Sequence, residues 1–201
     1  MNYPDFFNQV EEIELYDPIS EFLGVFNNGL IQFSYLDVVK TAGHSCPTVA
    51  GAYLVTLKAL KYLYPNSVPE RGGIKISVQE KFTEGVTGVI ATVFSQITGA
   101  TEVSGFKGIA GKFVRHSLMD FDADIKGQYK FTRIDTGDSV EVIYQPAAPV
   151  DPRQQPLMQK AIQGLATDDE LSLFGELWQE RVRMILIDLS NNPNVIRLIQ
   201  S

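Results

Sequence analysis

The stretch PTVAGAYLVTLKALKYLY, residues 47–64, sets the architecture that the rest of the chain must accommodate. Small and apolar residues lie on nearly every side of the helix it would form, with one continuous stripe at Ala50, Leu54, Leu57, Leu60 and Leu63. A helix that is apolar on most of its sides is usually buried. Pro65 and Asn66 then end the run. The sequence therefore predicts a central helix that other elements surround.

The segments on either side of this helix carry their own patterns. A short helix is predicted over 34–43, ending at Gly43, and alternation predicts a strand over 74–78. A second buried helix is predicted over 85–98, although its β-branched residues leave a strand as the alternative. Glycines at 105, 108 and 111 then indicate a loop.

Residues 112–145 are predicted to form a meander of strands. The first strand would carry Met119, Phe121, Ala123 and Ile125 on one face and His116 with three aspartates on the other. Residues 128–134 and 139–145 would form a hairpin around a turn at Gly137.

The two ends of the chain are predicted to be mainly helical. Residues 5–29 contain two short amphipathic stretches, the second opening at Asp17-Pro18 and continuing through Ile19, Phe22, Leu23 and Phe26. Near the other end, Thr167 and Glu170 have the spacing of a capping box. They would open a long helix with one apolar side formed by Leu171, Phe174, Trp178, Val182, Ile185 and Leu189.

Together these patterns predict an α+β fold, with a mixed or antiparallel sheet packed against buried helices. Four prolines within residues 146–156 indicate a semi-rigid linker. The predicted organisation is a core over 1–145 that includes the N-terminal helices, the linker, and a helical C-terminal extension over 157–201.

Composition and charge exclude several classes of protein. The formal net charge is −7, and lysines and arginines form no basic run. Because phosphate binding needs clustered cations, nucleic acid is not an expected partner. Without a run of ~20 apolar residues, no membrane span is expected. The start of the chain lacks a basic leader, and a single cysteine fits a reducing compartment. These features predict a cytoplasmic protein.

The segment Gly43-His44-Ser45-Cys46-Pro47 carries the residues with the most chemistry. With Cys46 as the N-cap and Pro47 in the first turn, the sulfur would face free N–H groups and the positive helix end, which favour thiolate. His44, two residues back, can point the same way. A His-x-Cys pair can chelate Zn²⁺, or it can join a base to a nucleophile. A buried structural cysteine is the third interpretation.

The segment GHSCP and the small-residue helix after it resemble the signature of the FmdE-like family of formylmethanofuran dehydrogenase components. A second, weaker similarity lies in SQITGATEVSGFKG, residues 95–108, which resembles the helix end and Thr-Gly-Cys-Thr turn of that family. The order of the following strands also matches, so the resemblance covers 34–145. It implies an α+β core, often dimeric, with a metal site at His44 and Cys46 and matching positions at Gly43 and Pro47.

This sequence departs from the family pattern in three places. Thr48 stands where glycine is usual. Residues 85–98 lack the family's further cysteines and acidic residue, and Ala100 stands where the cysteine of the Thr-Gly-Cys-Thr turn would be. A helical segment takes the place of the cysteine-rich finger that some members carry at the C-terminus. The resemblance therefore implies fewer protein ligands here than in family members that keep every cysteine.

These observations lead to rival functional hypotheses. In the first, His44 and Cys46 bind a divalent transition metal, with zinc expected, in a metal-dependent enzyme; His116 is the candidate third ligand, although a polar strand-face histidine is the alternative. In the second, the chain is a non-enzymatic accessory or ligand-binding subunit of a molybdenum or tungsten oxidoreductase system. In the third, Cys46 is a catalytic nucleophile with His44 as its base. A homodimer and a small-molecule ligand are the expected partners.

Overall fold

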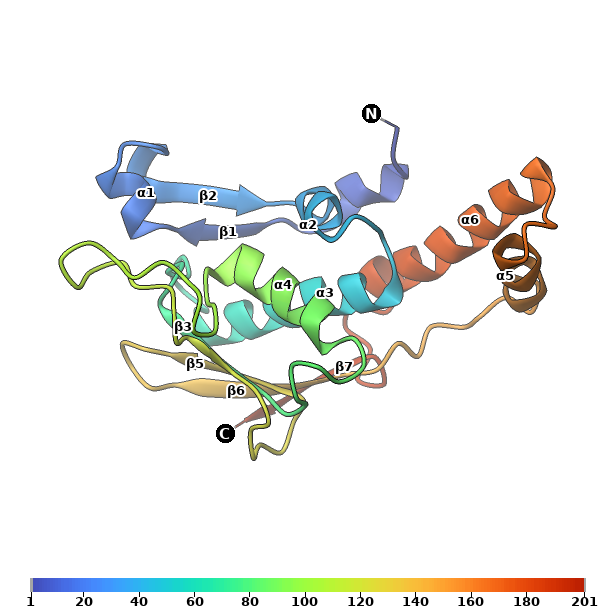
Figure 1. Cartoon of the computed structure of the whole chain (residues 1–201). Helices are drawn as coiled ribbons and strands as arrows, with labels where there is room; N and C mark the ends of the chain where they lie inside the picture. Colours follow the sequence, from blue (N-terminus) through green and yellow to red (C-terminus); the bar gives the residue numbers. More distant parts are fainter. Residues whose placement is uncertain (1, 201) are drawn as a thin grey trace.

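The computed structural model describes residues 2–200 and confirms an α+β fold in which helices lie between two sheets (Figure 1). The helices are η1 (Asp5–Gln9), α1 (Pro18–Phe22), η2 (Asn27–Gly29), α2 (Tyr35–Ala42), α3 (Pro47–Leu63), α4 (Thr87–Thr98), α5 (Gln154–Ile162), α6 (Asp168–Arg183) and η3 (Met184–Asp188). The strands are β1 (Ile13–Tyr16), β2 (Leu30–Phe33), β3 (Ile74–Val78), β4 (Met119–Asp120), β5 (Tyr129–Arg133), β6 (Ser139–Tyr144) and β7 (Ile196–Gln200).

Helix α3 is the buried central helix that the sequence predicts. It packs against α2, α4 and α6 and against strands β6 and β7. Its small residues let these neighbours approach closely. At Gly51, a Cβ atom would lie only 2.1 Å from Cε1 of Tyr144, so the Tyr144 ring occupies the space beside the helix backbone. The predicted helices over 34–43 and 85–98 are confirmed as α2 and α4.

The larger sheet is mixed and has the order β4-β3-β5-β6-β7. Strands β3 and β4 are parallel, and the remaining pairs are antiparallel. Side chains alternate as a half-buried sheet requires, with Ile74, Ile76 and Val78 buried and Lys75 between them exposed. Helices α3 and α4 cover this buried face (Figure 1). The predicted strand over 74–78 and the predicted hairpin are both confirmed.

The N-terminal part contains a hairpin that the sequence did not predict. Asp17 caps α1 as expected, accepting hydrogen bonds from the N–H groups of Ile19 and Ser20. The helix ends at Phe22, however, and Phe22 is 64% exposed. Strands β1 and β2 pair antiparallel on either side of it. The expected apolar helix face through Phe26 is therefore wrong, because the chain returns to form β2 instead.

The predicted strand through residues 116–125 is also wrong over most of its length. Only Met119 and Asp120 pair with β3. At Asp122 the backbone φ is 59°, a left-handed conformation that interrupts an extended strand. The chain therefore bends away after β4, and the proposed alternation of faces does not form.

The segment after the prolines packs against the core, through α6 on α3 and β7 on β6. Helix α5 begins at Gln154, inside the stretch predicted as linker, and the capping box of α6 is confirmed at Thr167 and Glu170. The expectation of a wholly helical segment over 157–201 is wrong at its end, because β7 pairs with β6. Residues 1 and 201, the outer limits of the two predicted segments, lie outside the described residues. Within 2–200, no helix is long and apolar enough to cross a membrane.

Candidate functional site

Cys46 occupies the N-cap of α3, the position expected from the sequence. Its backbone is extended, with φ −150° and ψ 168°, and Pro47 is the first helical residue. The Val49 N–H donates to the Cys46 sulfur at 3.5 Å. The sulfur thus satisfies one of the free N–H groups of the helix terminus. Cys46 is half-buried and packs against the hydrophobic core.

The connection between α2 and α3 that carries His44 and Cys46 is short. Gly43 caps the end of α2 with φ 77°, a left-handed conformation that glycine adopts without strain. Residues 43–46 alone separate Ala42, the last residue of α2, from Pro47, the first of α3. His44 and Cys46 are therefore held on one short connection between two packed helices.

The His44 ring is fixed by a hydrogen bond to the backbone. Nδ1 lies 2.9 Å from the carbonyl oxygen of Ala42. A carbonyl oxygen can only accept, so Nδ1 must carry the hydrogen. The neutral ring then keeps its lone pair on Nε2. The His44 side chain is exposed, which leaves Nε2 free to accept a proton or to bind a metal ion.

Helix α6 holds this connection in place through Ser45. Trp178 Nε1 donates to the Ser45 carbonyl oxygen at 3.0 Å, and Gln179 Nε2 donates to the same oxygen at 3.2 Å. The Ser45 hydroxyl donates to Gln179 Oε1 at 2.9 Å. The sequence places Trp178 on the apolar side of a helix and does not link it to the site. The apolar side of this helix was the one feature of the sequence that indicated packing of Trp178 against another part of the chain.

Two buried tyrosines support the connection from behind. The Tyr35 hydroxyl lies 3.0 Å from the Ser45 hydroxyl, and the Tyr144 hydroxyl donates to the Pro47 carbonyl oxygen at 2.7 Å. Burial raises the pKa of Tyr35 and of Tyr144 well above the usual range. Both phenols therefore stay neutral at physiological pH and act as fixed hydrogen-bonding groups.

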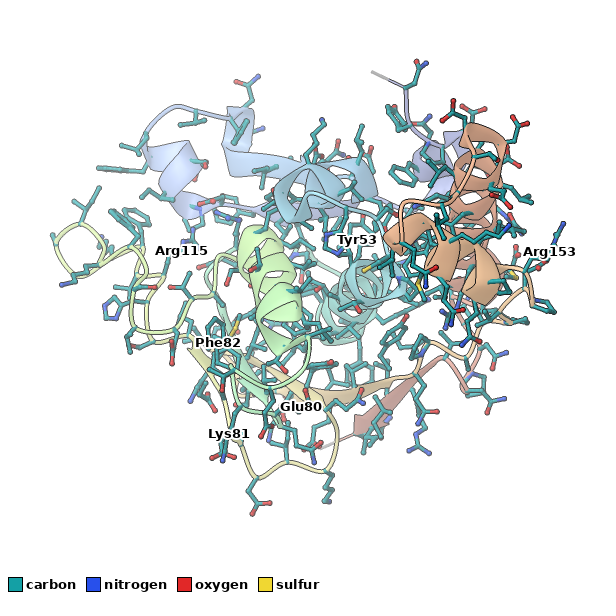
Figure 2. The ribbon with its side chains drawn as sticks, turned by 45° about the vertical axis from the view of Figure 1, so that its right-hand side comes forward. Tyr53, Glu80, Lys81, Phe82, Arg115 and Arg153 are labelled. Carbon is teal, nitrogen blue, oxygen red and sulfur yellow. The ribbon has the colours of Figure 1, made fainter. Side chains whose placement is uncertain are left out.

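His116 is not brought to His44 and Cys46. It lies in the loop before β4, where Nδ1 is 3.0 Å from the Ser117 hydroxyl. Its neighbour Arg115 forms an ion pair with Asp17, the cap of α1. Figures 1 and 2 place this loop and Arg115 away from the N-terminus of α3. Among residues 2–200, no group of three His, Cys, Asp or Glu side chains could hold a metal ion.

His44 and Cys46 are suitable zinc ligands by their chemistry, but two ligands are too few for a complete zinc site. Imidazole nitrogen and thiolate sulfur are both preferred zinc ligands. A closed structural site needs four ligands and a catalytic site usually has three from protein. His44 and Cys46 can therefore form only part of a zinc shell, and further ligands would have to come from outside the described residues.

The chain was also compared with known proteins. No protein-family model matches it, and no curated protein matches its sequence. The resemblance to the FmdE-like family therefore stays a prediction that rests on the residues quoted above.

Proposed function

We propose that this protein binds a divalent transition metal, zinc before others, in an open site formed by His44 Nε2 and Cys46 Sγ. The observation that carries the proposal is the His44–Ala42 hydrogen bond. Metal-binding histidines commonly donate their second ring N–H to a backbone carbonyl, which fixes the tautomer and aims the lone pair. Here that arrangement occurs two residues before a cysteine.

The residues around the pair have distinct roles in this proposal. The Cys46 sulfur accepts a hydrogen bond from the Val49 N–H at the N-terminus of α3, and the Ser45 contacts to α6 hold the connection that carries both side chains. The remaining coordination positions go to water, to a small-molecule ligand, or to a second copy of the chain in a homodimer. A bound zinc ion would supply Lewis acidity toward a water or carbonyl oxygen.

Cobalt(II) is a suitable probe because its bond to thiolate gives a charge-transfer absorption. Titration of the reduced protein with Co²⁺ is expected to produce that band, and Zn²⁺ is expected to abolish it. Cys46→Ser should remove the band, and His44→Gln should weaken binding roughly tenfold or more. His116→Gln is the matched control and should leave binding unchanged. A band that survives in Cys46→Ser would contradict the proposal.

The incomplete ligand set also favours a second candidate function, a non-enzymatic accessory protein that carries or hands over metal. Two protein ligands release a metal more readily than four. A competing chelator distinguishes the two functions: rapid transfer of zinc to the chelator supports a carrier, and slow release accompanied by turnover of a substrate supports an enzyme. Such a protein, with its thiol kept reduced, would work in the cytoplasm.

The alternative role of Cys46, as a covalent nucleophile, can be tested by alkylation. Alkylation by iodoacetamide is followed across pH in metal-free protein and again with excess Zn²⁺. A metal ligand should be protected by zinc. A thiol that reacts equally fast in both conditions, and faster than a free cysteine at neutral pH, would favour the nucleophile instead.

A further inference from the structure

A separate cavity of about 500 Å³ lies beside α4, away from the described contacts of Ser45 with α6. Its walls come from the end of α2, from α4, from the loop after α4, and from β4 with the residues that follow it. Figure 2 shows Phe82, another wall residue, beside α4. The size suits a small organic molecule.

Four of the five hydroxyl groups that line this cavity donate to backbone carbonyls, and the fifth belongs to the exposed Ser104. Thr92 donates to the Gly88 carbonyl at 2.9 Å, Ser95 to the Ala100 carbonyl at 2.6 Å, and Thr101 to the Arg115 carbonyl at 2.8 Å. Thr41 does the same with the Asp37 carbonyl at 3.3 Å. A hydroxyl has one hydrogen and two lone pairs. What these four side chains can still offer a ligand is therefore acceptor capacity.

Of the two remaining polar wall residues, Glu102 and Gln96, only Glu102 adds an acceptor that a ligand can reach. Glu102 is the only charged side chain lining the cavity within residues 2–200, and it is exposed. Gln96 donates from Nε2 to the Asp37 carbonyl at 3.0 Å, and its Oε1 is fully buried, so that oxygen does not face the cavity. The cavity thus combines one negative charge with a wall of oxygen atoms that accept hydrogen bonds.

The rest of the lining is apolar and aromatic. Met119 and Ala91 are buried wall residues. Phe82 and Phe121 meet edge to face with their centroids 5.1 Å apart, and Phe82 is 51% exposed. An aromatic ring face attracts a cation and also covers an apolar group. The apolar part of the wall adds contact for the body of an organic cation, which an inorganic ion lacks.

We propose that this cavity binds a small organic ammonium ion with an apolar body. The ammonium group donates to the Glu102 carboxylate and to the hydroxyl oxygens, and the apolar body lies against Phe82, Phe121 and Met119. An anion would meet the like charge of Glu102. This inference is independent of the metal site, because it uses none of the residues 43–47.

The test uses three probes that differ in one terminal group: 2-phenylethylammonium, the neutral 2-phenylethanol and the anionic 3-phenylpropanoate. Binding to the full chain is measured by calorimetry or by NMR titration. The ammonium probe should bind at least ~10-fold more tightly than either of the others, since hydrogen bonds to charged groups are the stronger ones. Its affinity should fall as salt is raised.

Two variants tie the binding to the cavity. Glu102→Gln keeps the shape and removes the charge, and it should weaken the ammonium probe about 10-fold. Phe82→Leu should weaken it several-fold through the lost aromatic face. Glu176→Gln is the matched control, because it removes one negative charge at an exposed position on α6. It should leave the affinity for the ammonium probe unchanged. Melting temperatures without ligand check that each variant is folded.

Three results would overturn the proposal. One is an equal affinity for the ammonium and carboxylate probes. Another is unchanged affinity in a folded Glu102→Gln variant. The third is displacement of the ammonium probe by equimolar Ca²⁺, which would make the cavity an inorganic cation site.

Discussion

The Tyr144 ring lies where a side chain of Gly51 would stand, and its hydroxyl reaches the carbonyl oxygen of Pro47 one turn earlier on α3. This contact joins the end of β6 to the first turn of the central helix. The position of Cys46, which caps that turn, therefore depends on how closely the sheet approaches α3. Stability and site geometry are linked through this one ring.

Gly51→Ala should destabilise the protein by about 1–3 kcal/mol. A methyl group at position 51 would overlap the Tyr144 ring, and the ring can move only by giving up its bond to Pro47. Urea denaturation measures the change. Gly175→Ala on α6 is the matched control, because nothing lies within 4 Å of the added carbon. That variant should be neutral or stabilising by ~0.5–1 kcal/mol. Equal effects at both positions would contradict the packing argument.

Asp17→Asn should be among the most damaging polar substitutions. The Asp17 carboxylate is buried and pairs with Arg71 at 2.9 Å and Arg115 at 2.8 Å. Removing one partner of a buried ion pair leaves an uncompensated charge and costs ~3–5 kcal/mol. Glu11→Gln, which removes the exposed ion pair with Lys61, should cost ~1 kcal/mol or less. A loss at Asp17 no larger than at Glu11 would be inconsistent with a buried network.

Alkaline pH should unfold the protein through its buried tyrosines. Burial raises the pKa of Tyr129 to about 12, above the value near 10 of an unfolded tyrosine. The folded state therefore favours the neutral phenol. This contribution is complete below about pH 10 and disappears as the pH rises through about 12.

Tyrosinate absorbance and circular dichroism check this together. Part of the tyrosine absorbance should appear only as the fold is lost, and Tyr129→Phe should move the unfolding midpoint to higher pH. If Tyr129 instead ionised while the circular dichroism was unchanged, the assignment to burial would fail.

Trp178→Phe should make Cys46 more reactive. The substitution removes the Nε1 donor from the Ser45 carbonyl, a hydrogen bond worth about 1 kcal/mol, so the 43–46 connection should open several-fold more often. The rate of alkylation of Cys46, the single cysteine, measures this directly. Leu171→Ala, at an exposed position on the same helix, is the control. An unchanged rate in Trp178→Phe would show that α6 does not hold the connection.

The sequence predicted those parts of the fold whose signals are local. The central helix follows from the composition of residues 47–64, and the cap at Asp17, the end at Gly43 and the capping box at Thr167 follow from neighbouring residues. Strands β1 and β2 have four residues each, too few for a periodic pattern to stand out. Alternating apolar residues after Met119 predicted a long strand, and the left-handed turn at Asp122 prevented it.

The candidate site likewise has a part that the local sequence predicts and a part that depends on tertiary structure. Cys46 as N-cap was predictable because Pro47 marks the start of the helix. The hydrogen bond that fixes His44 depends on the local path of the chain after α2, and the clamp on Ser45 depends on a helix more than a hundred residues away. No short-range pattern encodes either contact, and the separation of His116 from the pair likewise depends on tertiary structure.

The clamp of α6 on Ser45 has a consequence for how the protein is made. The two bonded residues are 133 positions apart, so a ribosome releases the His44–Cys46 segment long before it releases the indole that holds it. Until then the nascent chain carries a lone thiol on an untethered connection. If metal is loaded only once α6 has docked, the order of synthesis itself delays the site until most of the chain can fold.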